Sequence, residues 1–166
     1  MSVNIRSSVK LKDQVGLRGC IVELQDDLRQ IDPRMPTGEE IVDEYFEHIY
    51  RKCIECDGDI LVADTGSEIA GYALVLAKVV SDEIDDGRLE YGLIADLVVI
   101  RRFRGHGIGG ELLEAAESHA KSHAVKWLRI GVLADNDLAW ELYQSRGFRN
   151  FYVELEKDLG KSQNGS

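Results

Sequence analysis

Hydrophobic and polar positions along the 166-residue chain change their period several times, and each period predicts an element. Apolar residues recur at spacings of three and four over 17–31 and again over 41–56, which is typical of two amphipathic helices. Asp32-Pro33 and Pro36 end the first helix, and Thr37 with Glu40 forms a capping-box pattern at the start of the second. Weak alternation over 3–6 predicts a short opening strand.

Runs of apolar residues separated by turn residues predict strands after the two helices. The segments 60–64 and 69–80, with TGSE between them, read as a hairpin, and 89–100 reads as a third antiparallel strand. Further on, periodicity predicts helices over 108–120 and 136–147 and strands over 125–133 and 148–155. Asn136 is placed to cap the second of these helices. We expect residues 1–160 to form one domain and the polar segment 161–166 to be a disordered tail.

The stretch 93–124 joins a strand, a basic glycine-rich segment and a helix. The segment RRFRGHGIGG carries four glycines, whose missing Cβ lets the backbone approach a ligand. It ends where a helix begins, and the first turn of a helix has unpaired N–H groups and partial positive charge. Arg101, Arg102 and Arg104 can add bonds to phosphate oxygens. The order of elements therefore favours binding of a pyrophosphate.

Other interpretations of this segment fit less well. Gly105, Gly107 and Gly110 match G-x-G-x-x-G, but four residues separate them from the strand and the position twenty residues on offers no acid. A Walker loop needs Gly-Lys-Ser/Thr, which does not follow. A simple glycine-rich turn that caps a helix would not explain the arginines.

Two separated motifs resemble those of the GNAT acetyltransferase superfamily. Arg104-x-x-Gly107-x-Gly109, preceded by Leu97-x-Val99, is similar to the acetyl-CoA signature of that family. The downstream motif is matched at the family's spacing by Asn136, Ala139, Tyr143, Gly147 and Phe148. The resemblance is strong over 91–151 and weaker before it.

The resemblance implies a fold, a reaction and partners. The fold would be α/β (α+β), with a mixed, mostly antiparallel, twisted sheet of roughly six to seven strands flanked by about four helices. The reaction would be direct transfer of an acetyl group from acetyl-CoA to a primary amine of a small cation, peptide or protein. An acyl-CoA-binding sensor without transfer activity is the alternative. Family members often dimerise, so a homodimer is also compatible with the resemblance.

The resemblance also implies which residues bind acetyl-CoA. The strand residues would contact the pantetheine arm, the loop amides would hold the diphosphate, and Asn136 with Tyr143 would lie near the pantetheine and the thioester sulfur. The complete set is Leu97, Val98, Val99, Arg104, Gly105, His106, Gly107, Ile108, Gly109, Gly110, Asn136, Ala139 and Tyr143. His106 is either solvated or an occasional phosphate contact.

Acetyl transfer to an amine needs a base and an acid. A carboxylate near the amine can remove its proton, and the candidates are Glu90 and Asp96, which simple strand alternation places on one face. Asp96 interrupts an apolar run, so it is either functional or satisfied by a neighbouring backbone group. Tyr143 is the candidate acid that protonates the departing thiolate; otherwise it is a packed helix residue.

Composition limits the partners. A net charge of -10 argues against nucleic acid and is compatible with a cationic substrate. No export signal or bilayer-length apolar run is present, so we expect a cytoplasmic protein without membrane contact. Cys20, Cys53 and Cys56 cannot all pair, and Cys53-x-x-Cys56 lacks the further ligands of a zinc site, so we expect free thiols and no metal.

Overall fold

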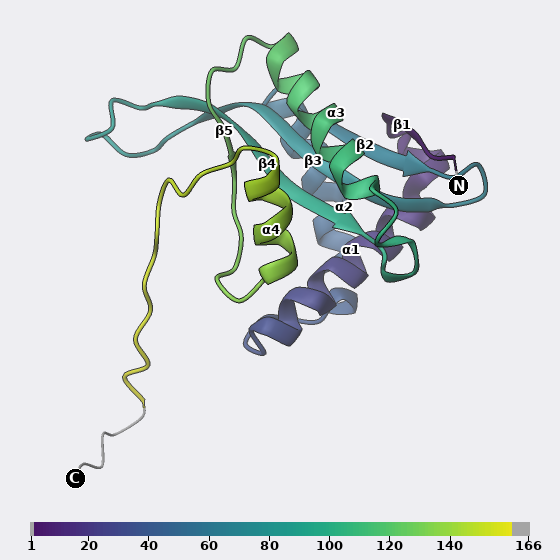
Figure 1. Cartoon of the computed structure of the whole chain (residues 1–166), viewed down its shortest axis with the longest axis horizontal. Helices are drawn as coiled ribbons and strands as arrows, with labels where there is room; N and C mark the ends of the chain where they lie inside the picture. The colour runs from purple at the N-terminus through teal and green to yellow at the C-terminus, as the bar shows by residue number, and fades with distance from the viewer. Residues whose placement is uncertain (1, 161–166) are drawn as a thin grey trace. The chain divides into compact units, whose positions relative to one another are not determined.

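The computed structural model describes residues 2–160 (Figure 1). Their elements, in chain order, are β1 (Asn4–Ser7), α1 (Lys10–Ile31), α2 (Gly38–Glu55), β2 (Asp59–Asp64), β3 (Ile69–Val80), β4 (Glu90–Val99), the 3-10 helix η1 (Arg101–Phe103), α3 (Ile108–Ser122), β5 (Leu128–Ile130) and α4 (Asp137–Ser145). The chain divides into two compact units, and the boundary along the sequence lies between Asp135 and Asn136. The first unit holds the sheet and α1 to α3, and the second holds α4. That all of 1–160 forms one domain stays a prediction, and 161–166 lies outside the described residues.

The sheet has the strand order β1-β2-β3-β4-β5. The first three pairings are antiparallel and β4 pairs with β5 in parallel, which confirms the expected α+β class with a mixed sheet and four α-helices. The described residues form five strands, fewer than the six to seven expected.

The strand predicted over 148–155 is absent from the described structure, so this prediction was wrong. This segment is in neither strand nor helix, and Tyr152 and Val153 are exposed. Alternation gives only a local preference, and a strand also needs a partner; the second unit supplies α4 but no strand within its described part. The strand predicted over 125–133 is shortened to β5.

Helices cover both faces of the sheet in the first unit (Figure 1). On one face, Leu17 and Ile21 of α1 and Phe46 and Ile49 of α2 join the buried core formed with Tyr72 and other strand residues. On the other face lies α3, whose buried stripe consists of Ile108, Leu112, Leu113, Ala116 and Ala120. The stripe has the predicted helical period. The loop between β4 and α3 therefore runs between the two layers of helices.

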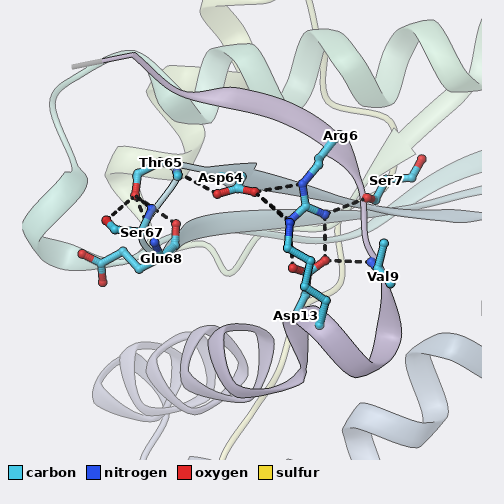
Figure 2. Close-up of polar contacts among 10 residues, drawn as sticks. Arg6, Ser7, Val9, Asp13, Asp64, Thr65, Ser67 and Glu68 are labelled. Carbon is cyan, nitrogen blue, oxygen red and sulfur yellow. Dashed lines mark hydrogen bonds and ion pairs between the residues drawn. The ribbon is translucent and has the colours of Figure 1, made fainter.

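A charged clamp ties β1, α1 and β2 together (Figure 2). The Arg6 guanidinium donates two bonds of 2.8 Å to the Asp13 carboxylate and bonds of 2.9 and 2.8 Å to Asp64 Oδ2. Asp13 Oδ2 also accepts the Val9 N–H at 2.7 Å, which caps the start of α1. This cap explains why α1 begins at Lys10, about two turns before the apolar period that predicted it. The Thr37–Glu40 capping box of α2 is confirmed.

Candidate active site

The glycine-rich loop enters α3 through two left-handed residues. Gly105 has φ 79° and Gly107 has φ 81°, a conformation that residues with a Cβ rarely adopt. A Cβ at either position would meet no atom within 4 Å, so the backbone here is open. The first helical bond of α3 runs from Glu111 N to Gly107 O at 3.1 Å. The N–H groups of 108–110 precede that bond and have no acceptor within the helix, which is the arrangement that favours an anion at a helix N-terminus.

His106 contributes to the loop from its side chain. The imidazole Nδ1 lies 3.0 Å from Arg104 O and 3.2 Å from Phe103 O, and the residue is exposed. The ring thus contacts the carbonyls of the preceding turn, which favours a role in shaping the loop over a catalytic role.

The three loop arginines are all paired with carboxylates. Arg101 contacts Asp27, Arg102 contacts Glu68, and Arg104 contacts Asp27 and Glu23. We expected these guanidinium groups to bind phosphate oxygens. In the structure they join the loop to α1 and the β2–β3 turn, so the backbone amides are the remaining candidates for binding a phosphate.

The strand before the loop has an open edge. Within the first unit, β4 pairs with β3 along most of its length, but it pairs with β5 only over Gly92–Ile94. Among the described residues of this unit, no strand pairs with the β5 side of Leu97, Val98 or Val99. Val99 O accepts the Arg104 Nε–H at 2.7 Å, and the other backbone groups on that side have no strand partner and could bind a ligand, as the resemblance implies for the pantetheine arm.

Asp96 lies in a buried polar cluster. Its carboxylate accepts the Tyr45 hydroxyl at 2.8 Å on Oδ1 and the Tyr72 hydroxyl at 2.8 Å on Oδ2. Asp96 is 8% exposed and Tyr72 is fully buried. Burial raises the pKa of Asp96, and the two phenolic hydrogen bonds oppose that rise. The partners are side chains of α2 and β3, not the backbone group that the sequence suggested as the alternative.

Glu90 and Asp96 face opposite sides of the sheet, so the expectation of a shared face was wrong. Leu74 pairs with Asp96 and the next residue of β3, Val75, pairs with Ile94, which leaves Ala95 as an extra residue. Such a β-bulge inverts the alternation. Asp96 therefore faces α1 and α2, whereas Glu90 is on the other side, at the exposed start of β4.

The second unit holds the other three expected site residues, with Asn136 at the N-cap of α4 and Ala139 and Tyr143 within the helix. Asn136 Oδ1 caps the helix by accepting the Ala139 N–H at 3.3 Å, as predicted, and this fixes the Asn136 side chain at the helix start. Tyr143 is 8% exposed and its ring centroid lies 6.1 Å from that of Phe148. Burial raises the pKa of Tyr143 to about 12, which keeps its hydroxyl protonated at neutral pH.

Comparison with known proteins identifies the family. The model of the acetyltransferase (GNAT) family matches residues 23–148, which include β4, the loop, α3 and α4. The chain belongs to the GNAT acetyltransferase family. No match is found among curated proteins.

Solved structures share the GNAT fold of this chain. The tetramutant of the BH1408 protein from Bacillus halodurans has 21% identity and a TM-score of 0.79, over 94% of this chain and 99% of that one. PH1933 from Pyrococcus horikoshii OT3 has 23% identity and a TM-score of 0.74, over 92% of each chain. Glucosamine-6-phosphate N-acetyltransferase from Arabidopsis thaliana has 24% identity and a TM-score of 0.63, over 96% and 99%.

The cysteines of this GNAT protein are free thiols. Burial raises the pKa of both Cys20 and Cys53 to about 12, so neither favours the reactive thiolate. Across residues 2–160, no three His, Cys, Asp or Glu side chains gather as a metal site. None of the helices described is both long and apolar enough to span a bilayer.

A cavity of about 510 Å³ opens between α1 and the β2–β3 turn. Its lining includes Arg6, Asp13 and Asp64, then Gly16, Gly19 and Cys20 of α1, and finally Ile100 and Arg102. No residue of 105–110 lines it. Its charged side chains are engaged with one another, as Figure 2 shows for Arg6, Asp13 and Asp64. This cavity is therefore separate from the loop amides.

Sequence reasoning missed the partners of the site residues. Tyr45, in a helix, and Tyr72, inside an apolar strand, were not predicted as site residues, yet the hydroxyl groups of both donate to Asp96. Glu23 and Asp27 were likewise not predicted as partners of the loop arginines, because the pairing joins α1 to a segment far along the chain. A buried carboxylate requires donors, so Asp96 itself was the signal that hydroxyl groups had to lie nearby.

Proposed function

We propose that this GNAT protein is an N-acetyltransferase that moves an acetyl group from acetyl-CoA directly to a primary amine. The observation that carries the proposal is the open β4 edge over Leu97–Val99 leading into the unpaired amides at the start of α3. The two left-handed glycines leave room for an anion beside those amides. A diphosphate joined to an extended arm fits this arrangement.

The chain's residues would hold the cosubstrate as follows. The N–H groups of 105–110 would bind the diphosphate, and the free edge of Leu97, Val98 and Val99 would bind the pantetheine arm. Asn136 and Ala139, at the start of α4, are proposed contacts of acetyl-CoA, as the resemblance implies. When bound, acetyl-CoA supplies an acetyl group activated as a thioester. The raised pKa of Cys53 supports transfer without a covalent cysteine intermediate.

Two residues would handle protons. An amine of pKa about 10.4 needs a base near neutral pH. We propose that Asp96 takes that proton through the Tyr45 hydroxyl, which would accept a proton from the amine as its own proton passes to Oδ1 at 2.8 Å. Exposed Glu90, on the opposite face, is the weaker candidate. Tyr143, which burial keeps protonated near neutral pH, would donate its hydroxyl proton to the departing thiolate.

The acceptor is proposed to be a cationic amine, because the chain carries a net charge of -10.

Isothermal titration with acetyl-CoA, and separately with NADH, tests whether the glycine-rich loop binds coenzyme A. Binding of acetyl-CoA alone should then be followed by a thiol-release screen against polyamines, aminoglycosides, lysine and peptide amino-termini. Binding without thiol release from any amine would favour the acyl-CoA-binding sensor, and binding of NADH alone would overturn the proposal.

A further inference from the structure

Two acidic residues of α1 hold the beginning of the phosphate loop. Glu23 and Asp27 are four residues apart, so they lie on one face of the helix, one turn from each other. Both are partly buried, with side-chain exposures of 31% and 24%. They contact the loop at Arg101 and Arg104, two residues whose positions set the path of the chain from β4 into the glycines.

Glu23 binds the backbone of the loop. Its Oε1 accepts the N–H of Arg101, the first residue of η1. The residue before η1, Ile100, supplies no side-chain cap, so Glu23 caps this short helix from a distant element. A 3-10 turn of three residues has little stability of its own, and the cap fixes where it begins.

Asp27 and Arg104 form the second tie. Arg104 Nε donates to Val99 O at 2.7 Å, and Arg104 Nη2 contacts Asp27 and, at 3.5 Å, Glu23. Arg101 Nη2 also bonds to Asp27 at 2.8 Å. One carboxylate thus joins two guanidinium groups, and Arg104 joins α1 to the last carbonyl of β4. A network of this kind is stronger than an isolated surface ion pair.

Positioning matters here because the next residues include glycines, whose backbone has more allowed conformations than that of other residues. Gly105 and Gly107 have no Cβ, and a Cβ added at either position would meet no atom within 4 Å, so no packing holds the backbone there. Without a support before them, the amides of 105–110 would sample many orientations, and a ligand would have to order them at a cost in affinity. The ties at Arg101 and Arg104 end immediately before the first of these glycines.

We propose that Glu23 and Asp27 are positioning residues of the phosphate site, which orient the loop amides from α1 without contacting the diphosphate. The inference rests on the proposed function, since it assumes that those amides bind coenzyme A. It also assigns Arg104 a different task from phosphate binding: its guanidinium fixes the loop between Val99 and α1.

The test is isothermal titration of the full chain with coenzyme A, which requires no acceptor. Glu23→Ala should weaken the Kd by about fivefold to tenfold, the effect of losing one hydrogen bond that preorganises the site. Glu23→Gln should restore most of the affinity, because its amide oxygen can still accept the Arg101 N–H. Glu114→Ala on the exposed face of α3 removes the same charge and should bind as the unmodified protein does.

The outcomes separate this inference from the proposed function. A merely structural role would lower the unfolding midpoint of Glu23→Ala and leave the Kd unchanged at a temperature where the protein is folded; that result, or tighter binding, would overturn the inference. Failure of the unmodified protein to bind coenzyme A would instead overturn the proposed function. If Glu23→Ala does not fold, Asp27→Ala is the second variant, and equal affinity there would likewise reject the positioning role.

Discussion

The Tyr45 hydroxyl lies 2.8 Å from Asp96 Oδ1 and joins α2 to the middle of β4. The second carboxylate oxygen accepts the hydroxyl of buried Tyr72, so both oxygens of a buried acid are satisfied. The arrangement is costly when Asp96 is ionised, because two neutral donors compensate only part of the lost hydration. The cluster is therefore a source of pH-dependent stability as well as a candidate proton acceptor.

Asp96→Asn should remove a loss of unfolding free energy that the unmodified protein undergoes as the pH rises. The folded pKa of Asp96 is raised by burial, so the folded protein binds more protons than the unfolded chain above pH ~3.9. The contribution of Asp96 is fully present below that pH and is lost as the pH rises through the folded pKa. Between pH ~3.9 and the folded pKa of Asp96, the unfolding free energy of the unmodified protein should fall relative to that of Asp96→Asn by up to about 1.4 kcal/mol per pH unit.

Urea unfolding of both proteins from pH 4 upward measures this difference. Asparagine keeps one acceptor and gains a donor, so it can still contact both tyrosines. A difference in unfolding free energy that stays constant with pH would mean that Asp96 has an ordinary pKa in the folded protein.

Asp13→Asn should show the opposite slope. The Arg6 side-chain hydrogen bonds lower the pKa of Asp13, so its stabilising contribution is present above pH ~3.9 and is lost as the pH falls through the folded pKa. At pH 7 the variant should lose about 1–3 kcal/mol of unfolding free energy, because Arg6 loses one of the two carboxylates that it pairs with and keeps Asp64. The loss should shrink toward pH 3 in urea titrations. A loss that does not shrink would contradict the pKa shift.

Gly107→Ala should damage binding and stability together. Its φ of 81° costs an alanine about 1–2 kcal/mol, and relief of that strain would move the amides at the start of α3. The unfolding free energy should fall by that amount, and the Kd for coenzyme A should rise by about tenfold. Calorimetry and urea unfolding measure the two effects.

Gly66→Ala is the matched control for this variant. Gly66, in the β2–β3 turn, has φ 91° and also meets no atom within 4 Å of a Cβ. It should lose a similar amount of stability and keep its affinity. Equal loss of affinity in both variants would show that the effect at Gly107 comes from general destabilisation.

Local patterns predicted most of the fold. The periodicity of α2 and α3, the TGSE turn and the Asn136 cap each depend on residues close in the chain, and all appear where they were expected. The segment 148–155 was predicted wrongly because a strand requires a partner, and alternation does not reveal whether one is present. The early start of α1 depends on Asp13, whose Arg6 and Asp64 contacts join three elements.

The parts of the candidate site that the backbone forms were predictable from the sequence. Four glycines before an apolar helix indicated the loop and its amides, and the asparagine cap followed from its spacing to α4. The side-chain relationships were not predictable, because they depend on tertiary packing. The bulge at Ala95 separates Glu90 from Asp96, and no residue at that position signals it. Likewise, Glu23 reaches Arg101 across 78 positions of sequence.

Tyr143→Phe tests the acid proposed for the reaction. Burial holds the pKa of Tyr143 at about 12, so the phenol would carry its proton throughout the working pH range. Its loss should lower turnover by about 10²-fold, the usual effect of removing a general acid, while the Kd for acetyl-CoA changes little because the ring remains. Thiol-release kinetics and calorimetry on the same preparations separate the two quantities. Unchanged turnover with an active amine would remove Tyr143 from the acid role and leave it as a packing partner of Phe148.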